Sequence, residues 1–203
     1  MPTQDYHYVN DLIILKKKHH LIKHIDASLP TPEIHGTKVW GSSFLIMDYL
    51  EEHPPANFSE ILEVGCGWGL LGIHCAKTYG AEVTAIDADP HVFPYLDAHS
   101  VINDVELETL TARYEDLKIK DMKGYDMVLG GDICFWDELI EPLFSMVQKA
   151  IKAKVGTIII ADPGRSPFLE LARRCQEAFD AELIERVVKK PRKIEGNLLV
   201  IRS

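Results

Sequence analysis

A glycine-rich loop is the part of the sequence best suited to hold a ligand. The segment Leu62-Glu-Val-Gly-Cys-Gly-Trp-Gly69 places Gly65, Gly67 and Gly69 between an apolar run and a helical pattern. Glycine there lets the backbone turn sharply and approach a ligand, while N–H groups at the helix start point into the same space. Dinucleotide-binding enzymes use a related loop, so the glycines alone leave the ligand class open.

Two acidic residues near the loop separate the ligand classes. Glu63 precedes the first glycine, and Asp87 ends the next apolar run. A carboxylate beside a pyrophosphate is repulsive, whereas S-adenosylmethionine has no phosphate and carries an ammonium group and a sulfonium. Asp87 can bind both hydroxyls of a ribose, which either cofactor has. The pair favours S-adenosyl-L-methionine as cofactor. The alternative is a structural strand–helix turn with Glu63 on the surface.

A third contact to the cofactor is expected in the turn after the third predicted strand. Arg113 and Tyr114 stand there, and one of them, for which we choose Tyr114, could line the adenine. The alternative is an ordinary surface loop.

Short apolar runs alternate with helical patterns and must position these residues. Strands are expected at 61–64, 82–86, 107–112, 125–129 and 155–161, and helices at 41–52, 70–79, 90–102 and 137–152, with another after Ser166-Pro167. Ser42 or Ser43 should cap the first helix, Gly80 should close the second, and Pro94 should kink or delay the third. Alternating units of this kind predict a parallel sheet with helices on both faces.

The last two predicted strands, 181–188 and 198–201, follow one another without a helix. They imply an antiparallel hairpin at one edge, which is unlike a dinucleotide-binding fold. The expected fold is therefore α/β: a Rossmann-like, doubly wound, seven-stranded sheet, mostly parallel with a C-terminal antiparallel hairpin.

The N-terminal part reads differently from the rest. An apolar stretch between Tyr6 and Lys18 suggests an edge hairpin, and Pro30 and Pro32 then interrupt regular structure. We expect residues 1–35 to form an N-terminal extension and residues 36–203 one domain, because 203 residues would be cramped as two.

The net charge and the hydropathy of the chain limit the classes of partner that we expect. The formal charge of −9 opposes general nucleic-acid binding, which needs a basic surface. An acidic surface would suit a basic protein partner, although solubility alone also explains it. No apolar run approaches the ~20 residues of a membrane helix, and the first residues lack the order of a signal peptide. We therefore expect no nucleic-acid partner, no membrane partner and a cytoplasmic location.

Cysteine and histidine give no support for a metal site. The four cysteines Cys66, Cys75, Cys134 and Cys175 lack CxxC spacing and are expected to be reduced and mostly buried. His19, His20 and His24 lie close in sequence, but no acid or cysteine completes a site, so no metal is expected.

The motifs together resemble a known family. Residues 62–89 resemble the cofactor half of class I, seven-β-strand methyltransferases. The run 128–139, with Asp132-Ile-Cys-Phe135, resembles the signature after strand four in the seven-strand protein-lysine methyltransferases. The run 160–168 resembles one branch, the electron-transfer flavoprotein β-subunit lysine methyltransferases. The resemblance covers residues 32–203 and implies S-adenosylmethionine-dependent methylation of a protein lysine.

By this resemblance, Asp132 and Phe135 are the catalytic pair, and Trp40 and Asp132 lie near the cofactor. Asp132 follows a central strand, where ligands bind in open sheets. It should position the amine more than deprotonate it, because a carboxylate that holds the ammonium raises the amine pKa. Phe135 would offer an aromatic wall to a cationic side chain. The alternatives are a helix cap for Asp132 and core packing for Phe135 and Trp40.

The sequence leaves alternatives open for Trp68 and for the segment with Asp162 and Arg165. For Trp68 the alternatives are to shield the methionine part of the donor or to cover the helix face. Asp162 and Arg165 end the fifth strand and either shape the substrate mouth or form a loop salt bridge. Residues 189–193 form a basic run that we interpret as a solvated hairpin tip.

Four functional hypotheses follow. The first is N-methylation of a protein lysine with S-adenosylmethionine as donor. The second is methylation of a small-molecule amine or metabolite, and the third is a non-catalytic S-adenosylmethionine-binding module. A NAD-dependent oxidoreductase is disfavoured by Glu63 and by the terminal hairpin.

Overall fold

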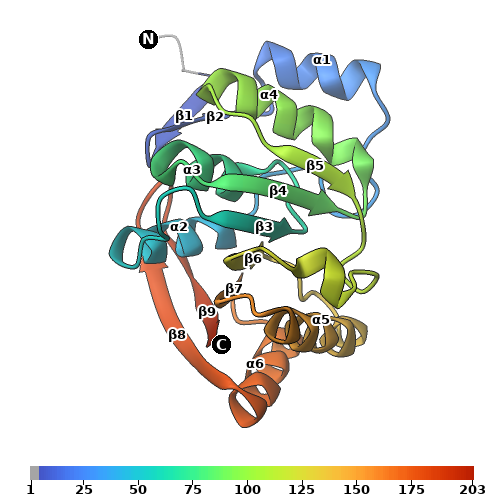
Figure 1. Ribbon diagram of the computed structural model, residues 1–203. Coiled ribbons are helices and arrows are strands. Elements are labelled where there is room, and N and C mark those ends of the chain that lie inside the picture. Colours follow the sequence, from blue (N-terminus) through green and yellow to red (C-terminus); the bar gives the residue numbers. More distant parts are fainter. Residues whose placement is uncertain (1–4) are drawn as a thin grey trace.

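The central sheet has seven strands in the order β5-β4-β3-β6-β7-β9-β8 (Figure 1). In this computed structural model, which describes residues 5–203, they are β3 (Glu60–Val64), β4 (Glu82–Asp87), β5 (Glu108–Thr111), β6 (Met127–Gly131), β7 (Thr157–Asp162), β8 (Asp180–Val188) and β9 (Ile194–Arg202). Strands β3 to β7 run parallel to one another, and β9 pairs antiparallel with both β7 and β8. The predicted α/β architecture and its terminal hairpin are confirmed.

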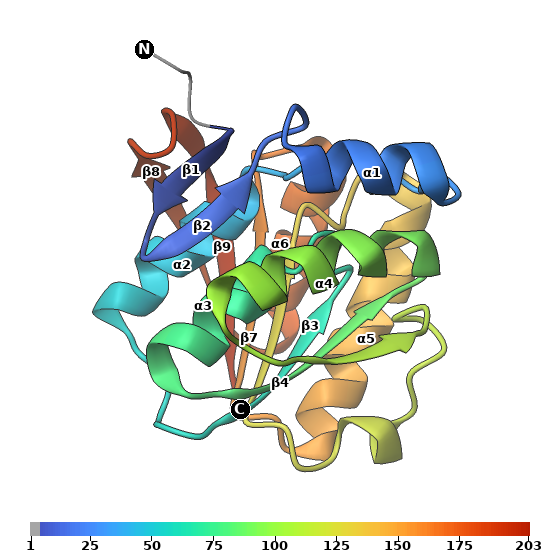
Figure 2. The same ribbon diagram turned by 90° about the horizontal axis from the view of Figure 1, so that it is seen from above.

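Helices cover both faces of this sheet, as Figures 1 and 2 show. One face carries α2 (Ser42–Glu52), α3 (Leu70–Tyr79) and α4 (Phe93–Asn103), and the other carries α5 (Ile140–Ala153) and α6 (Ser166–Ala178). Single turns occur at η1 (Pro90–Val92), η2 (Ile119–Met122) and η3 (Asp137–Leu139). The strands read as continuous apolar runs because both of their faces are buried.

The N-terminal segment differs from the expectation in two ways. The hairpin exists as β1 (Tyr6–Val9) and β2 (Leu12–Leu15), but it forms its own two-stranded sheet and is not an edge of the main one. It docks on α4, where Leu15 N–H donates to His99 Nε2 over 3.1 Å. A helix, α1 (His20–Ser28), follows it. This helix went unpredicted because only Ile22 and Ile25 are buried along it.

The domain division at residue 35 stays a prediction, and residues 1–4 of the expected extension lie outside the described residues. No helix within residues 5–203 combines the length and apolarity needed to cross a bilayer. All four cysteines are buried and free, as expected.

Among the strand ends that lie near the site, those of β6 and β9 differ from the expected bounds by two residues or more. β6 was expected to stop at Leu129 but extends to Gly131, directly before Asp132. β9 begins at Ile194, four residues earlier than expected. Pro94 lies in the first turn of α4 after the short turn η1, so it delays the helix and does not kink it.

Candidate functional site

The glycine loop connects β3 to α3 in a conformation that only glycine adopts easily. Gly65, Gly67 and Gly69 have φ angles of 65°, 53° and 69°, in the left-handed region. A Cβ on Gly65 would lie 2.6 Å from the Ile133 side chain. The loop therefore presents bare backbone to the cavity that Gly65 and Gly67 line.

Glu63 lies beneath this loop and not in the cavity wall. Its Oε2 accepts a hydrogen bond from the Gly72 N–H in α3 over 2.9 Å. Burial raises the pKa of the Glu63 carboxyl to about 8, and the nearby negative charge of Asp87 adds to this. The geometry favours a role in fixing the loop to α3, and direct contact of Glu63 with a cofactor stays a prediction.

Asp87 ends β4 at the cavity, as the sequence predicts. Its Oδ2 accepts from the Gly67 N–H and its Oδ1 from the Asp89 N–H, both over 3.0 Å. Burial raises the pKa of its carboxyl. A carboxylate oxygen has two lone pairs, so each oxygen can accept one further bond from a ligand hydroxyl.

The segment 33–36, for which the sequence indicated no functional role, covers the part of the cavity next to Asp87. Asp89 Oδ2 accepts from the Glu33 and Ile34 N–H groups over 2.6 and 3.2 Å. Trp68 Nε1 donates to the Gly36 carbonyl over 2.8 Å. The Asp-x-Asp spacing at the end of β4 was the available signal for Asp89.

Trp68 helps to hold the segment 33–36 in place. Its ring is buried and stacks on Tyr95 at 4.9 Å between centroids. Trp68 does not line the cavity beside the glycine loop.

The opposite wall of the cavity comes from the turns after β5 and β6. Arg113 and Tyr114 both line it, and Arg113 also pairs with Glu115 at 2.7 Å; contact of Tyr114 with an adenine stays a prediction. Burial raises the pKa of the Tyr114 hydroxyl. The remaining lining residues include Ile34, His35, Gly36, Trp40, Gly131, Asp132, Ile133, Phe135, Trp136 and Leu139, around about 150 Å³ of free space.

Asp132 lies at the carboxyl end of β6 with both carboxylate oxygens engaged. Oδ2 accepts from the Ser42 N–H over 2.9 Å, and Oδ1 accepts from Arg165 Nη1 over 3.0 Å. Asp132 therefore caps α2, and the predicted capping by the Ser42 or Ser43 side chain is wrong. Gly131 permits this approach, since a Cβ there would lie 3.2 Å from the Ser43 nitrogen.

Arg165 joins the two predicted acids. The same Nη1 is 2.6 Å from Asp162 Oδ2. Asp162 Oδ1 accepts from the Gly164 and Arg165 N–H groups, so this carboxylate binds two backbone donors directly before α6. The predicted Asp162–Arg165 pair is confirmed, and its extension to Asp132 was not foreseen.

Aromatic rings surround the Asp132–Arg165 pair. The Arg165 guanidinium carbon is 4.5 Å from the Phe135 ring centroid and 5.8 Å from that of Trp40. The Trp40 and Phe135 centroids are 5.2 Å apart, and His35 lies 4.8 Å from Phe135. Phe135 and Trp40 thus line the cavity and face a cation that is already present; their contacts with substrate and cofactor stay predictions.

Comparison with known proteins identifies a family and individual relatives that match most of the chain. The sequence profile of a family described as lysine methyltransferase matches residues 23–175. A ubiquinone biosynthesis O-methyltransferase of Xanthomonas campestris is 29% identical over 149 residues, which cover 71% of this chain and 58% of the relative. An electron transfer flavoprotein beta subunit lysine methyltransferase of Danio rerio is 24% identical over 140 residues, covering 68% and 54%. The chain thus spans a little over half of the length of these curated relatives.

Solved structures share the fold. The human methyltransferase 10 domain containing protein superposes with a TM-score of 0.61 at 10% identity, over 81% of this chain and 84% of that one. A SAM-dependent methyltransferase from Agrobacterium tumefaciens superposes with a TM-score of 0.63 at 15% identity, over 81% and 63%.

Proposed function

The chain belongs to the lysine methyltransferase family, and on that premise we propose that it methylates the ε-amine of a lysine in a protein substrate. S-Adenosylmethionine is its cofactor. The observation that carries the lysine assignment is the Asp132–Arg165 pair, set between the Trp40 and Phe135 rings beside the glycine loop.

The donor side of the site fits the cofactor. The bare backbone at Gly65 and Gly67 would hold it, Asp87 would accept from its ribose, and Tyr114 would cover its adenine. When bound, it supplies a methyl group on a positively charged sulfur. Ligand pockets usually measure about 300–1,000 Å³, so the present cavity of about 150 Å³ would have to widen to admit the cofactor.

The acceptor side explains how a lysine becomes a nucleophile. Its amine must lose a proton, and its ordinary pKa is ~10.4. Asp132 alone would hold the ammonium form, but Arg165 already pairs with that carboxylate at 3.0 Å. Arg165 also pairs with Asp162, so it offsets only part of the Asp132 charge, and its own positive charge opposes an arriving ammonium and favours the uncharged amine. A spare lone pair of Asp132 can orient the amine, while Trp40 and Phe135 flank its methylene chain.

The test uses the purified protein with S-adenosylmethionine labelled in the methyl group and a cell lysate. After incubation, protein and small molecules are separated and counted. We expect the label in protein, and Asp132→Asn, which keeps an acceptor for Ser42 N–H, should lose it. Label confined to small molecules would contradict the lysine assignment.

Methylation of a small molecule is the second candidate. Similarity to the ubiquinone biosynthesis O-methyltransferase of Xanthomonas campestris favours it. In the same experiment it predicts label in the small-molecule fraction, with chromatography to separate oxygen from nitrogen products.

A further inference from the structure

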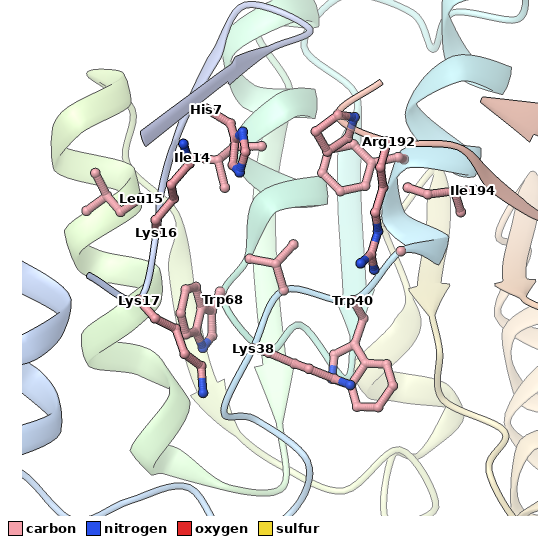
Figure 3. Close-up of a pocket in the computed structure, with 14 residues that line it drawn as sticks. His7, Ile14, Leu15, Lys16, Lys17, Lys38, Trp40, Trp68, Arg192 and Ile194 are labelled. Carbon is pink, nitrogen blue, oxygen red and sulfur yellow. The ribbon is translucent and has the colours of Figure 1, made fainter. Parts of the chain in front are cut away.

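A second cavity lies next to Trp40, outside the cofactor cavity. It measures about 300 Å³ and opens between the β1–β2 hairpin, the segment 38–41 and the β8–β9 loop (Figure 3). Its floor includes the apolar side chains of Phe44, Trp68 and Ile194. Three segments far apart in the sequence therefore build one pocket.

This cavity is basic although the chain carries a net charge of −9. Its cationic lining residues are Lys16, Lys17, Lys38 and Arg192, and no described lining residue is acidic. Lys38 Nζ lies 4.0 Å from the Trp40 ring centroid. Figure 3 shows Lys38 and Arg192 extending toward Trp40 from two sides. Lys17, Lys38 and Arg192 are exposed, so they can rearrange onto a ligand.

The basic cavity adjoins the acceptor side of the site, because the two hollows share lining residues. Lys38, Trp40 and Arg192 also line a neighbouring hollow, whose other wall contains Asp132 and Arg165. A chain that places one side chain at Asp132 can thus reach the basic cavity with a neighbouring side chain.

We propose that this cavity binds acidic side chains of the protein substrate that lie close in sequence to the target lysine. The inference rests on the proposed function and names the chemistry of its substrate. Aspartate and glutamate complement the basic lining, and their short apolar stems suit Phe44 and Ile194. The run 189–193, which the sequence suggests is a solvated hairpin tip, would then supply substrate contacts through Arg192.

A peptide fits this surface better than a nucleic acid. The basic lining surrounds one cavity of about 300 Å³ and includes the apolar Phe44 and Ile194, whereas nucleic-acid binding needs a longer basic surface. Asp132 and Glu195 at the adjoining hollow would also oppose a phosphate chain.

The first experiment measures binding by fluorescence polarisation, independently of methyl transfer. The probes are a labelled peptide with one lysine flanked by aspartate and glutamate, its asparagine and glutamine counterpart, and a single-stranded RNA of similar length. We expect the acidic peptide to bind about tenfold tighter than the neutral one, and rising salt to weaken it. Arg192→Glu and Lys17→Glu should each remove most of this preference.

The control is Lys123→Glu, which makes the same charge change at an exposed lysine after η2, beside α5 on the other face of the sheet. It should bind like the wild type. Equal affinity for both peptides, equal loss with Lys123→Glu, or tighter binding of the RNA would overturn the proposal.

The second experiment supplies labelled S-adenosylmethionine to the same peptides and separates the two claims. An acidic peptide that binds through Arg192 but receives no methyl group supports the basic cavity and counts against lysine methylation. Equal methylation of the acidic and neutral peptides supports lysine methylation and overturns the cavity's assignment.

Discussion

Replacing Glu63 with glutamine should remove a pH dependence of stability that the buried carboxyl imposes. The side chain is 3% exposed, and burial raises its pKa from 4.5 to about 8. Because the folded state holds this proton more tightly than the unfolded chain, the contribution to stability is complete below about pH 4.5. It is lost as the pH rises through about 8.

The size of the effect follows from this shift in pKa. At about 1.4 kcal/mol per unit, the carboxyl contributes roughly 3 kcal/mol less at about pH 8 than at about pH 5. For a chain of this length that corresponds to roughly 6–12 °C in melting temperature. Glutamine stays neutral at both pH values and can still accept the Gly72 N–H. We therefore expect the melting temperature of Glu63→Gln minus that of the wild type to be larger at about pH 8 than at about pH 5, by roughly 6–12 °C.

The assay is thermal unfolding of the cofactor-free protein, followed by circular dichroism at both pH values. Glu106→Gln is the matched control, since it makes the same change at an exposed glutamate. The melting temperature of Glu106→Gln minus that of the wild type should be the same at both pH values. If Glu63→Gln shows the same offset from the wild type at about pH 5 and about pH 8, burial does not keep this carboxyl protonated and the reasoning is refuted.

Three substitutions test other contacts. Asp132→Asn should slow methyl transfer about 100-fold or more. Its cofactor affinity, measured by calorimetry, should stay within about threefold of the wild-type value. Unchanged turnover would contradict the role of Asp132. Gly131→Ala should destabilise the protein by about 1–3 kcal/mol in urea unfolding, because its Cβ would lie 3.2 Å from the Ser43 nitrogen. Trp68→Phe should cost about 1 kcal/mol by losing its bond to Gly36, and an unchanged unfolding midpoint would count against that bond.

Short-range patterns in the sequence were sufficient for the sheet and its helices. The glycine loop, the closure at Gly80 and the proline in the first turn of α4 each depend on residues adjacent in sequence. The position of Asp87 at the cavity followed from the rule that parallel strands end at one edge.

Contacts between distant residues could not be read in the same way. The hydrogen bond from Ser42 N–H to Asp132 joins residues 90 positions apart. The local sequence offers only the serines at the start of α2 as capping residues, and these were therefore predicted. Arg165 reaches Asp132 across 33 residues, which is why only its local pair with Asp162 was foreseen.

Helix α1 shows a different limit. It buries only Ile22 and Ile25, against the cluster that contains Trp68 and Tyr95, and it is capped by the His19 side chain. Histidine is not a usual capping residue, so the sequence carried no clear start signal for this helix.

The most direct test of lysine methylation identifies the residue that receives the label. Protein labelled by the wild type and S-adenosylmethionine is hydrolysed to amino acids and separated by chromatography. The proposed function predicts label in Nε-methyllysine and none with Asp132→Asn. Label in any other amino acid, or equal labelling by both proteins, would contradict it.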